Sequence, residues 1–208
     1  MKVTKLLIAT RNQAKFAEAK LLLSDFPLQL CSLSDVRIAE SPGETGRTFE
    51  ENAIIKARYY GGLANLPTLS DDGGLEIDEL GGWPGVYSRR MFGLDKPEAS
   101  DEEMIVETLR RLQGVASDRR GCSFSFVMAL FVPPSAIYTG SGSVRGMIPY
   151  DPCTARVAGF PFRSIFYLPS LGKTVAELSP EGQARFMNHR KTAILQLEPY
   201  LRELASYA

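Results

Sequence analysis

The N-terminal segment has the pattern of a strand, a helix and a second strand in immediate succession. Residues 5–9 (KLLIA) form an apolar run suited to one short buried strand, and the polar turn at 10–13 (TRNQ) follows directly. Apolar side chains then recur with helical spacing over residues 14–23, and a second strand-like segment covers 28–33. This order is typical of α/β folds, in which helices cover a sheet.

Further elements are expected along the chain. Thr48 is predicted to cap a helix that runs to about residue 63, with Glu51 completing a capping box. A short strand over 66–70 is expected to end on the turn 71–74 (DDGG). The remaining expected elements are an amphipathic helix over 101–113, two long strands over 122–132 and 136–147 separated by Pro133-Pro134, a short strand over 165–168, and a helical segment from 179 that Pro199 kinks or restarts.

Together these elements predict an α/β fold with a long central mixed β-sheet flanked by helices. The chain has 208 residues, which is enough to bury a substantial core. No internal repeat, low-complexity segment or clear interdomain linker interrupts it, so a single domain spanning 1–208 is expected.

Composition narrows the partners and the compartment. The chain carries 24 Lys and Arg against 24 Asp and Glu, so its formal net charge is zero. Nucleic acid is therefore not expected as a partner, since proteins that bind it usually carry a basic excess, whereas a small anion needs only a local basic pocket. No apolar run approaches the roughly 18 residues of a membrane span, and no signal peptide is visible. Three widely spaced cysteines fit a reducing compartment, so a cytoplasmic protein is expected.

The turn after the first strand is a candidate phosphate site. It combines the hydroxyl of Thr10, the amide of Asn12 and the ammonium of Lys15 with the backbone N–H groups that open a helix. Such N–H groups bind anions well. The turn lacks the glycines of a P-loop, and a simple capped strand-to-helix turn explains the same residues equally well.

Three carboxylates form a candidate metal site. Glu44 lies in a loop, and Asp71 and Asp72 follow a predicted strand beside two glycines. Mg²⁺ typically takes one or two carboxylates and fills its other positions with water and substrate phosphate. Taken alone, however, the Asp-Asp-Gly-Gly segment is more often an exposed turn.

Two C-terminal segments offer groups that suit a nucleobase or a phosphate. Phe160 and Phe162 could stack on a base and Arg163 could hydrogen-bond one, although two core aromatics flanking a turn are at least as common. Further on, the loop residue Lys173 and the pair His189-Arg190 supply donors, and the planar fork of an arginine matches phosphate or a carbonyl edge. None of these groups decides a function by itself.

In order along the chain, these segments resemble the family of inosine/xanthosine triphosphate pyrophosphatases, and the resemblance covers almost all of it. Residues 7–15 (LIATRNQAK) are similar to the family's T-x-N-x-x-K opening, and residues 44–57 (ETGRTFEENAIIKA) to its E-T-G-x-T-F-x-E-N-A-x-x-K-A segment. The other similar blocks are 70–75 (SDDGGL) to A-D-D-S-G-L, 80–88 (LGGWPGVYS) to L-G-G-x-P-G-(I/V)-Y-S, 172–178 (GKTVAEL) to G-K-T-x-A-E-L, and 188–190 (NHR) to S-H-R.

The resemblance implies a magnesium-dependent hydrolase that cuts non-standard purine nucleotides such as (d)ITP and XTP to monophosphate and pyrophosphate. It also implies a homodimer, with the active site in a cleft between two lobes. Asp72 and Lys56 are the implied catalytic residues, Asp72 activating water and Lys56 lying at the phosphates, while Glu44, Asp72 and Asp71 are the implied metal site. The expected substrate-binding residues are Thr10, Arg11, Asn12, Lys15, Gly73, Phe160, Phe162, Arg163, Lys173, His189 and Arg190.

The chain departs from the family pattern chiefly where the base would bind. The family pattern G-G-F-G-Y-D-P-I-F is replaced at 158–166 by AGFPFRSIF, so an acidic position becomes Arg163. Gly73 and Asn188 stand where the family usually has serine. Because Asp-to-Arg inverts the charge and replaces acceptors with donors, we expect altered base preference with the hydrolytic centre retained. A pyrophosphatase for modified pyrimidine nucleotides and a nucleotide-binding homologue that has lost catalysis are the alternatives.

Overall fold

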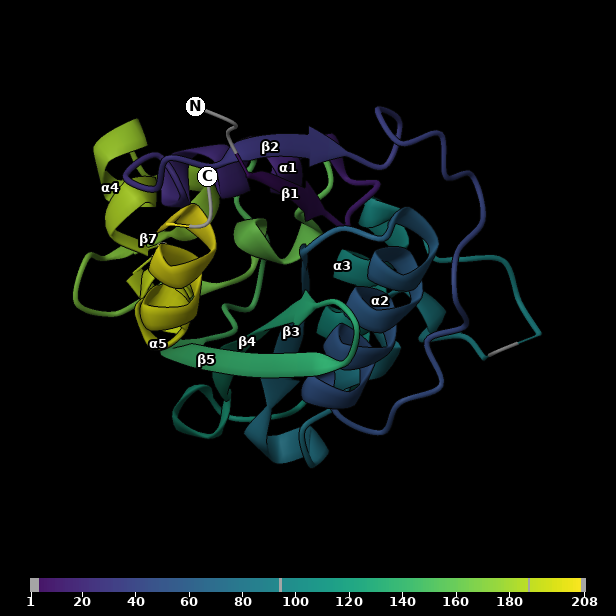
Figure 1. The fold of residues 1–208 in the computed structure, drawn as a ribbon. Helices are drawn as coiled ribbons and strands as arrows, with labels where there is room; N and C mark the ends of the chain where they lie inside the picture. Colours follow the sequence, from purple (N-terminus) through teal and green to yellow (C-terminus); the bar gives the residue numbers. More distant parts are fainter. Residues whose placement is uncertain (1–3, 94, 187, 207–208) are drawn as a thin grey trace. The chain divides into compact units, whose positions relative to one another are not determined.

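The structure, a computed structural model, describes residues 4–93, 95–186 and 188–206, with the side chains of residues 180, 184, 185, 188 and 189 left out (Figure 1). Its strands form one sheet in the order β2-β1-β3-β4-β5-β6-β7. The strands are β1 (Lys5–Ile8), β2 (Gln29–Ser32), β3 (Thr68–Ile77), β4 (Gly121–Val132), β5 (Ala136–Met147), β6 (Tyr167–Leu168) and β7 (Lys173–Thr174). The α-helices are α1 (Gln13–Leu22), α2 (Phe49–Ala64), α3 (Asp101–Arg111), α4 (Pro180–Phe186) and α5 (Asn188–Ser206).

The sheet combines both kinds of strand pairing. Strand β1 pairs in parallel with β2 and with β3, whereas β6 pairs antiparallel with β5 and with β7. The predicted α/β class with a mixed central sheet and flanking helices is therefore confirmed. None of the helices in the described part of the chain is long and apolar enough to cross a membrane.

The chain divides into two compact units. The first unit consists of residues 1–72, 126–142 and 189–208, and the second of 73–125 and 143–188. Strands β3, β4 and β5 each contribute residues to both units.

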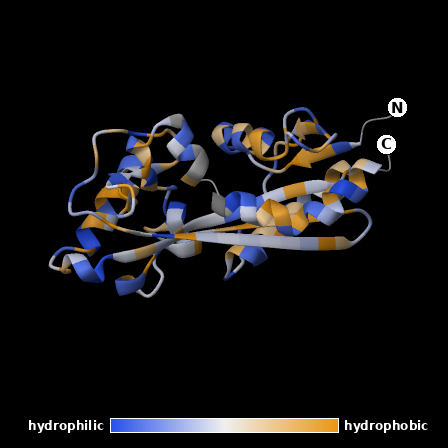
Figure 2. Cartoon of the chain, turned by 90° about the vertical axis from the view of Figure 1, so that its left-hand side faces the viewer, coloured by the Kyte–Doolittle hydropathy of each residue, from blue (hydrophilic) through white to orange (hydrophobic). Residues whose placement is uncertain are grey.

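In the first unit, apolar side chains cover both faces of the sheet. On one face, Leu6 and Ile8 of β1 and alternate residues of β4 pack with apolar residues of α1 and α5. On the other, Leu7 packs with Tyr60 of α2, and a further small cluster joins α2 to Ala129 and Phe131 of β4. The switch of partners between successive residues follows from the two-residue period of a strand. In Figure 2 the helix that leads to the C-terminus carries both hydrophobic and hydrophilic residues.

The second unit has a separate aromatic core. Phe124 makes edge contacts with Phe162, Phe166 and Phe186, at centroid distances of 6.5, 5.4 and 6.2 Å. The buried guanidinium of Arg120 donates to the carbonyls of Leu112, Ile148 and Pro149. Each of the three guanidinium nitrogens thus has a carbonyl acceptor, and these hydrogen bonds compensate for the burial of the charge.

The largest correction concerns the Asp-Asp-Gly-Gly segment. Instead of ending a short strand, residues 71–74 lie within β3, which continues to Ile77. The pairing with β1 covers Thr68 and Leu69, and β4 is the neighbour of β3 on its other side, so ladder hydrogen bonds with a long strand outweigh the weak strand preference of Asp and Gly. The buried side chains Leu75 and Ile77 hold the C-terminal half in the core of the second unit.

Three smaller predictions are also corrected. Thr48 caps α2 by accepting from the backbone N–H of Glu51, but the Glu51 carboxylate accepts from the N–H of Arg47, one residue before the position that a capping box requires. The strand expected over 165–168 is confined to Tyr167–Leu168, after a short 3-10 turn. Pro199 lies inside α5, which continues through it, so of the two expected effects the restart is wrong and the kink stays a prediction.

Two adjacent glycines of α2 predict opposite effects on stability. A Cβ added at Gly61 would lie 2.3 Å from Cδ1 of the buried Phe131, whereas one added at the exposed Gly62 would meet nothing within 4 Å. We expect Gly61→Ala to destabilise the fold by about 1–3 kcal/mol through overpacking. The matched variant Gly62→Ala should stabilise it by about 0.5–1 kcal/mol, because alanine favours the helix. Thermal or urea unfolding measures both, and two shifts of the same sign would contradict the packing described for α2.

Candidate functional site

Strand β3 places its two neighbouring aspartates on opposite faces of the sheet in the first unit. Ser70 donates from Oγ to the carbonyl of Ala53 in α2, at 2.5 Å, so its side chain faces that helix. Leu69 packs on the other face with residues of α1 and α5. By the two-residue period, Asp72 shares the face of Ser70 and Asp71 shares that of Leu69. The ion pairs of the two aspartates agree with this assignment.

On the α2 face, one lysine holds two carboxylates. Nζ of Lys56 lies 3.0 Å from Oε1 of Glu44 and 3.1 Å from Oδ1 of Asp72. Lys56 is placed there by α2, Asp72 by β3 and Glu44 by the loop that precedes α2. Three successive segments of the first unit therefore bring their charges to one point.

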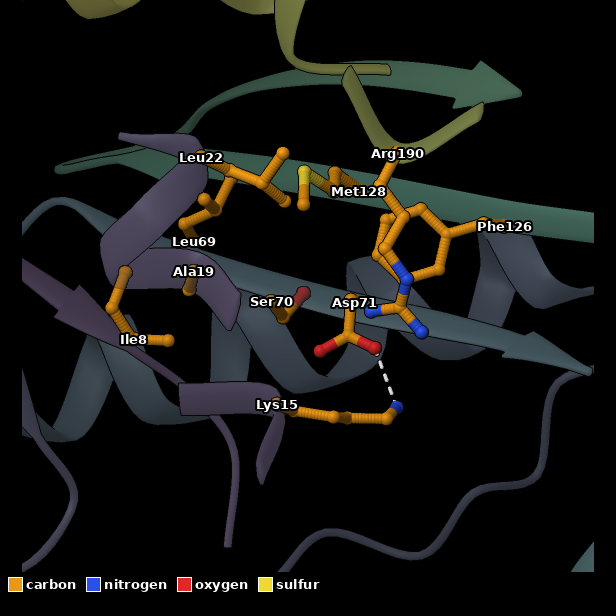
Figure 3. A pocket seen from close by; sticks show the side chains of 10 residues that line it. All are labelled: Ile8, Lys15, Ala19, Leu22, Leu69, Ser70, Asp71, Phe126, Met128 and Arg190. Carbon is orange, nitrogen blue, oxygen red and sulfur yellow. Dashed lines mark hydrogen bonds and ion pairs between the residues drawn. The ribbon is translucent and has the colours of Figure 1, made fainter. Parts of the chain in front are cut away.

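On the opposite face, Lys15 pairs with Asp71. Asn12 caps α1 by accepting from the N–H groups of Ala14 and Lys15, which fixes the first turn of the helix. From that turn Nζ of Lys15 reaches Oδ2 of Asp71 at 2.5 Å, as Figure 3 shows. The phosphate-binding turn predicted from the sequence thus begins a capped helix whose lysine is already paired with an acid.

Arg190 of α5 lies beside the pair formed by Lys15 and Asp71. Its guanidinium lies 4.1 Å above the ring of Phe126, and one of its nitrogens lies 3.1 Å from Oε2 of Glu18 in α1. In Figure 3 it points toward Asp71 from the side opposite Lys15. Lys15, Asp71 and Arg190 line a pocket, together with Ser70 and six apolar residues, whose empty volume is about 280 Å³, part of it open to solvent.

The two aspartates differ in proton affinity. Burial raises the pKa of Asp72 above its ordinary value, because burial outweighs the opposing attraction of Lys56. Burial also acts upward on the pKa of Asp71, but the attraction of Lys15 and then of Lys56 outweighs it and holds that pKa below its ordinary value. Burial acts downward on the pKa of Lys56, and Asp72 and Glu44 more than offset it, so the pKa is raised and the amine stays charged. Asp72 is consequently the better proton acceptor of the two acids.

The donor set of the α2 face fits a small hard cation. Oxygens of Glu44 and Asp72 already converge on one cationic centre, the Lys56 ammonium, which marks where a positive charge is favoured. Mg²⁺ needs only one or two carboxylates when phosphate and water complete its shell. In the described part of the chain there is no cluster of three or more His, Cys, Asp or Glu suited to a metal.

The remaining predicted site residues have varied surroundings. Thr10 accepts from the N–H of Asn12, and the exposed Arg11 donates to the carbonyl of Ala39. Gly73 continues β3 into the second unit, and Lys173 is exposed on β7 there. The side chain of His189 lies outside the described residues.

In the second unit, residues 160–166, which belong to the segment that departs from the family's base-binding pattern, are buried. Phe162 belongs to the aromatic core, and the guanidinium of Arg163, 5% exposed, lies 3.8 Å from the ring centroid of Phe160. Arg163 therefore covers one face of that ring.

Sequence reasoning missed one residue of the first-unit site. Glu18 is buried in α1 and pairs with Arg190. Its position three residues after Lys15, on the same face of a helix, was the available signal, but a Glu at helical spacing is usually exposed.

Strand β3 thus carries two lysine-paired acids beside the N-terminus of α1, an arrangement that can bind an anionic ligand. The Ham1 family model matches residues 6–200. The dITP/XTP pyrophosphatase of Yersinia pseudotuberculosis is 39% identical over 203 residues, covering 96% of this chain and 98% of that protein. The corresponding enzyme of Geobacter sulfurreducens is 37% identical, over 96% of this chain and 97% of its own.

Solved structures agree with these relatives. The Ham1 protein of Coxiella burnetii has a TM-score of 0.82 and 36% identity, covering 97% of this chain and all of its own. That of Staphylococcus aureus has a TM-score of 0.81 and 34% identity, over 96% and 99% of the two chains. The chain belongs to the Ham1 family.

Proposed function

We propose that this protein is a nucleoside triphosphate pyrophosphatase that hydrolyses non-standard purine nucleotides, such as dITP and XTP, to the monophosphate and pyrophosphate. The observation that carries the proposal is the meeting of Lys56, Glu44 and Asp72 on one face of β3, with Lys15 and Asp71 on the other. The two relatives named above are called dITP/XTP pyrophosphatases and match over nearly their full lengths.

The first unit supplies groups for each part of the reaction. The N-terminus of α1 and the ammonium of Lys15 bind the phosphate chain, with Lys15 exchanging Asp71 for a phosphate oxygen. Asp72, beside Lys56 on β3, orients a water molecule in line with the bond to be broken and accepts its proton. Lys56, charged and buried beside Asp72, offsets the negative charge that develops on the phosphate oxygens.

Magnesium is the cofactor that fits this arrangement. Glu44 and Asp72 would hold it, and Asp71 would support them from the other face of β3. When bound, the ion neutralises phosphate charge and orients the triphosphate. The carboxylates then serve the ion and the water, while Lys56 remains a fixed positive charge beside them.

The proposal is tested by pyrophosphate release from a panel of nucleotides. Inosine, xanthosine, guanosine, adenosine and pyrimidine triphosphates, in ribo and deoxy forms, are compared with and without magnesium. We expect release to require magnesium and to be fastest with the inosine and xanthosine nucleotides. A pyrimidine preference would favour the alternative specificity, and binding without release would favour a homologue that has lost catalysis.

Altered base discrimination is proposed as a second property of the same enzyme. It rests on Arg163, which lies over the ring of Phe160 where the family pattern has an acid. We expect Arg163→Met, which removes the charge and keeps the length, to change the ratio of kcat/KM for inosine and adenosine triphosphates by about tenfold, the scale of one or two polar contacts. Steady-state kinetics of the purified variant and of the parent protein, each with inosine and with adenosine triphosphate, measure this ratio. An unchanged ratio would assign Arg163 to the core of the second unit alone.

The homodimer and the cytoplasmic location stay predictions from the sequence and the family resemblance. Size-exclusion chromatography with light scattering tests the first.

A further inference from the structure

Arg11 has an arrangement that its neighbours do not share. The side chains of Thr10 and Asn12 form hydrogen bonds within the turn. Thr10 accepts from the N–H of Asn12, and Asn12 caps α1. The side chain of Arg11 instead leaves the turn and donates to the carbonyl of Ala39, 28 residues away in sequence. That carbonyl belongs to the long loop that carries Glu44.

This loop, residues 33–48, contains no regular helix or strand in the structure. At its start the buried Leu33 packs in the first unit, and the N–H of Ile38 donates to the carbonyl of Leu33. At its end the N–H of Gly46 donates to Oδ1 of the buried Asn52 in α2. Between these anchored ends, Arg11 contacts the segment at Ala39 and Lys56 contacts it at Glu44.

The guanidinium of Arg11 also lies close to α2. Burial raises the pKa of the Tyr60 hydroxyl, and the charge of Arg11 and its hydrogen bond to that hydroxyl act in the opposite direction. Tyr60 lies one helical turn after Lys56, on the same side of α2. Arg11, which belongs to the turn before α1, thus contacts the Glu44 loop and the helix that carries Lys56, all in the first unit.

We propose that Arg11 is a positioning residue, which ties the loop 33–48 to the turn before α1 and so holds Glu44 beside Lys56 and Asp72. Its effect on turnover rests on the function proposed above, through the metal-binding carboxylate. The contact of Arg11 with the loop 33–48 is present in the protein without substrate. It differs from the phosphate-binding role expected from the sequence, in which Arg11 would contact the nucleotide.

The two roles predict different results for Arg11→Ala. If Arg11 ties the loop, the hydrogen-bonded amides of Ile38 and Gly46 exchange faster without any ligand, by about fivefold to tenfold, the scale of one hydrogen bond. The magnesium concentration for half-maximal rate then rises by a similar factor, while KM for the nucleotide at saturating magnesium stays within about twofold. If Arg11 binds phosphate, that KM rises and loop exchange is unchanged.

The experiment compares the full-length protein with three variants, by hydrogen exchange and by magnesium titration of pyrophosphate release. Arg11→Ala removes the tie and Arg11→Lys retains a charged donor on a shorter side chain. Arg47→Ala is the matched control, because it removes an exposed arginine from the same loop. Peptides from β1 and α5 report whether a variant has lost the fold as a whole.

We expect faster loop exchange in Arg11→Ala, partial restoration in Arg11→Lys and no change in Arg47→Ala. Unchanged exchange in Arg11→Ala, or faster exchange with an unchanged magnesium requirement, would overturn the proposal. If the parent protein releases no pyrophosphate from any nucleotide, the proposed function fails, and the exchange result still decides whether Arg11 ties the loop.

Discussion

Asp72→Asn is expected to slow magnesium-dependent pyrophosphate release by about 1,000-fold, the scale of losing a general base. The amide keeps the shape of the side chain but cannot accept the proton of the attacking water, and it binds a hard cation more weakly than a carboxylate does. Asp72 is the aspartate whose pKa is raised by burial, and it shares Lys56 with Glu44. Rates at saturating nucleotide and magnesium measure the effect.

Asp71→Asn is the matched control for this variant. It makes the same chemical change at the adjacent residue, on the opposite face of β3, where Lys15 is the partner. We expect a loss of about tenfold, since it disturbs a phosphate-binding lysine and leaves the proton acceptor in place. Nucleotide binding by calorimetry should persist in both variants. Equal losses of rate at the two positions would contradict the division of roles between the faces of the strand.

Of the substitutions proposed at the site, Lys56→Met is expected to lower the free energy of unfolding most, and it should also slow pyrophosphate release strongly. It leaves Glu44 and Asp72 facing each other without the ammonium that lies about equally far from both. Breaking a buried pair in this way costs about 3–5 kcal/mol. The side chains of Lys56 and Asp72 are each 13% exposed but that of Glu44 is 38% exposed, so solvent screening lowers the expected cost to about 2–4 kcal/mol.

Magnesium should partly reverse this loss. A divalent cation held by the same two carboxylates replaces the missing charge, so the rise in Tm on adding magnesium should be larger in Lys56→Met than in the parent protein. The rate at saturating magnesium should still fall by about 100-fold, because the fixed charge at the phosphates is gone. The double variant Lys56→Met/Glu44→Gln, in which Asp72 no longer faces a second carboxylate, should recover part of the stability in the absence of metal. A Tm that responds equally to magnesium in all three proteins would place the ion elsewhere.

The parts of the fold that depend on short-range pattern could be predicted from the sequence. Strand β4 follows from its apolar and aromatic run, β5 from its position after Pro133-Pro134, and α1 begins where Asn12 and the apolar spacing indicate. Strand β3 could not be predicted in full, because Asp71 to Gly74 disfavour a strand locally and are held in one by neighbours that are distant in sequence.

The candidate site shows the same limit. The residue types that carry charge could be named from the sequence, but their pairing could not. Asp71 faces Lys15 of α1, and Asp72 faces Lys56 of α2. This difference depends on how β3 is placed between the two helices. The burial of Glu18 against Arg190 and the reach of Arg11 to Ala39 depend on contacts between segments that no local pattern records.

The most direct test of the central claim is the identity of the products. Phosphorus NMR of dITP incubated with the protein and magnesium distinguishes the bond that is cut, since a monophosphate with pyrophosphate differs from a diphosphate with inorganic phosphate. The site predicts the monophosphate and pyrophosphate in equal amounts, formed by the parent protein and not by Asp72→Asn. A diphosphate with phosphate, or equal turnover by the two proteins, would contradict it.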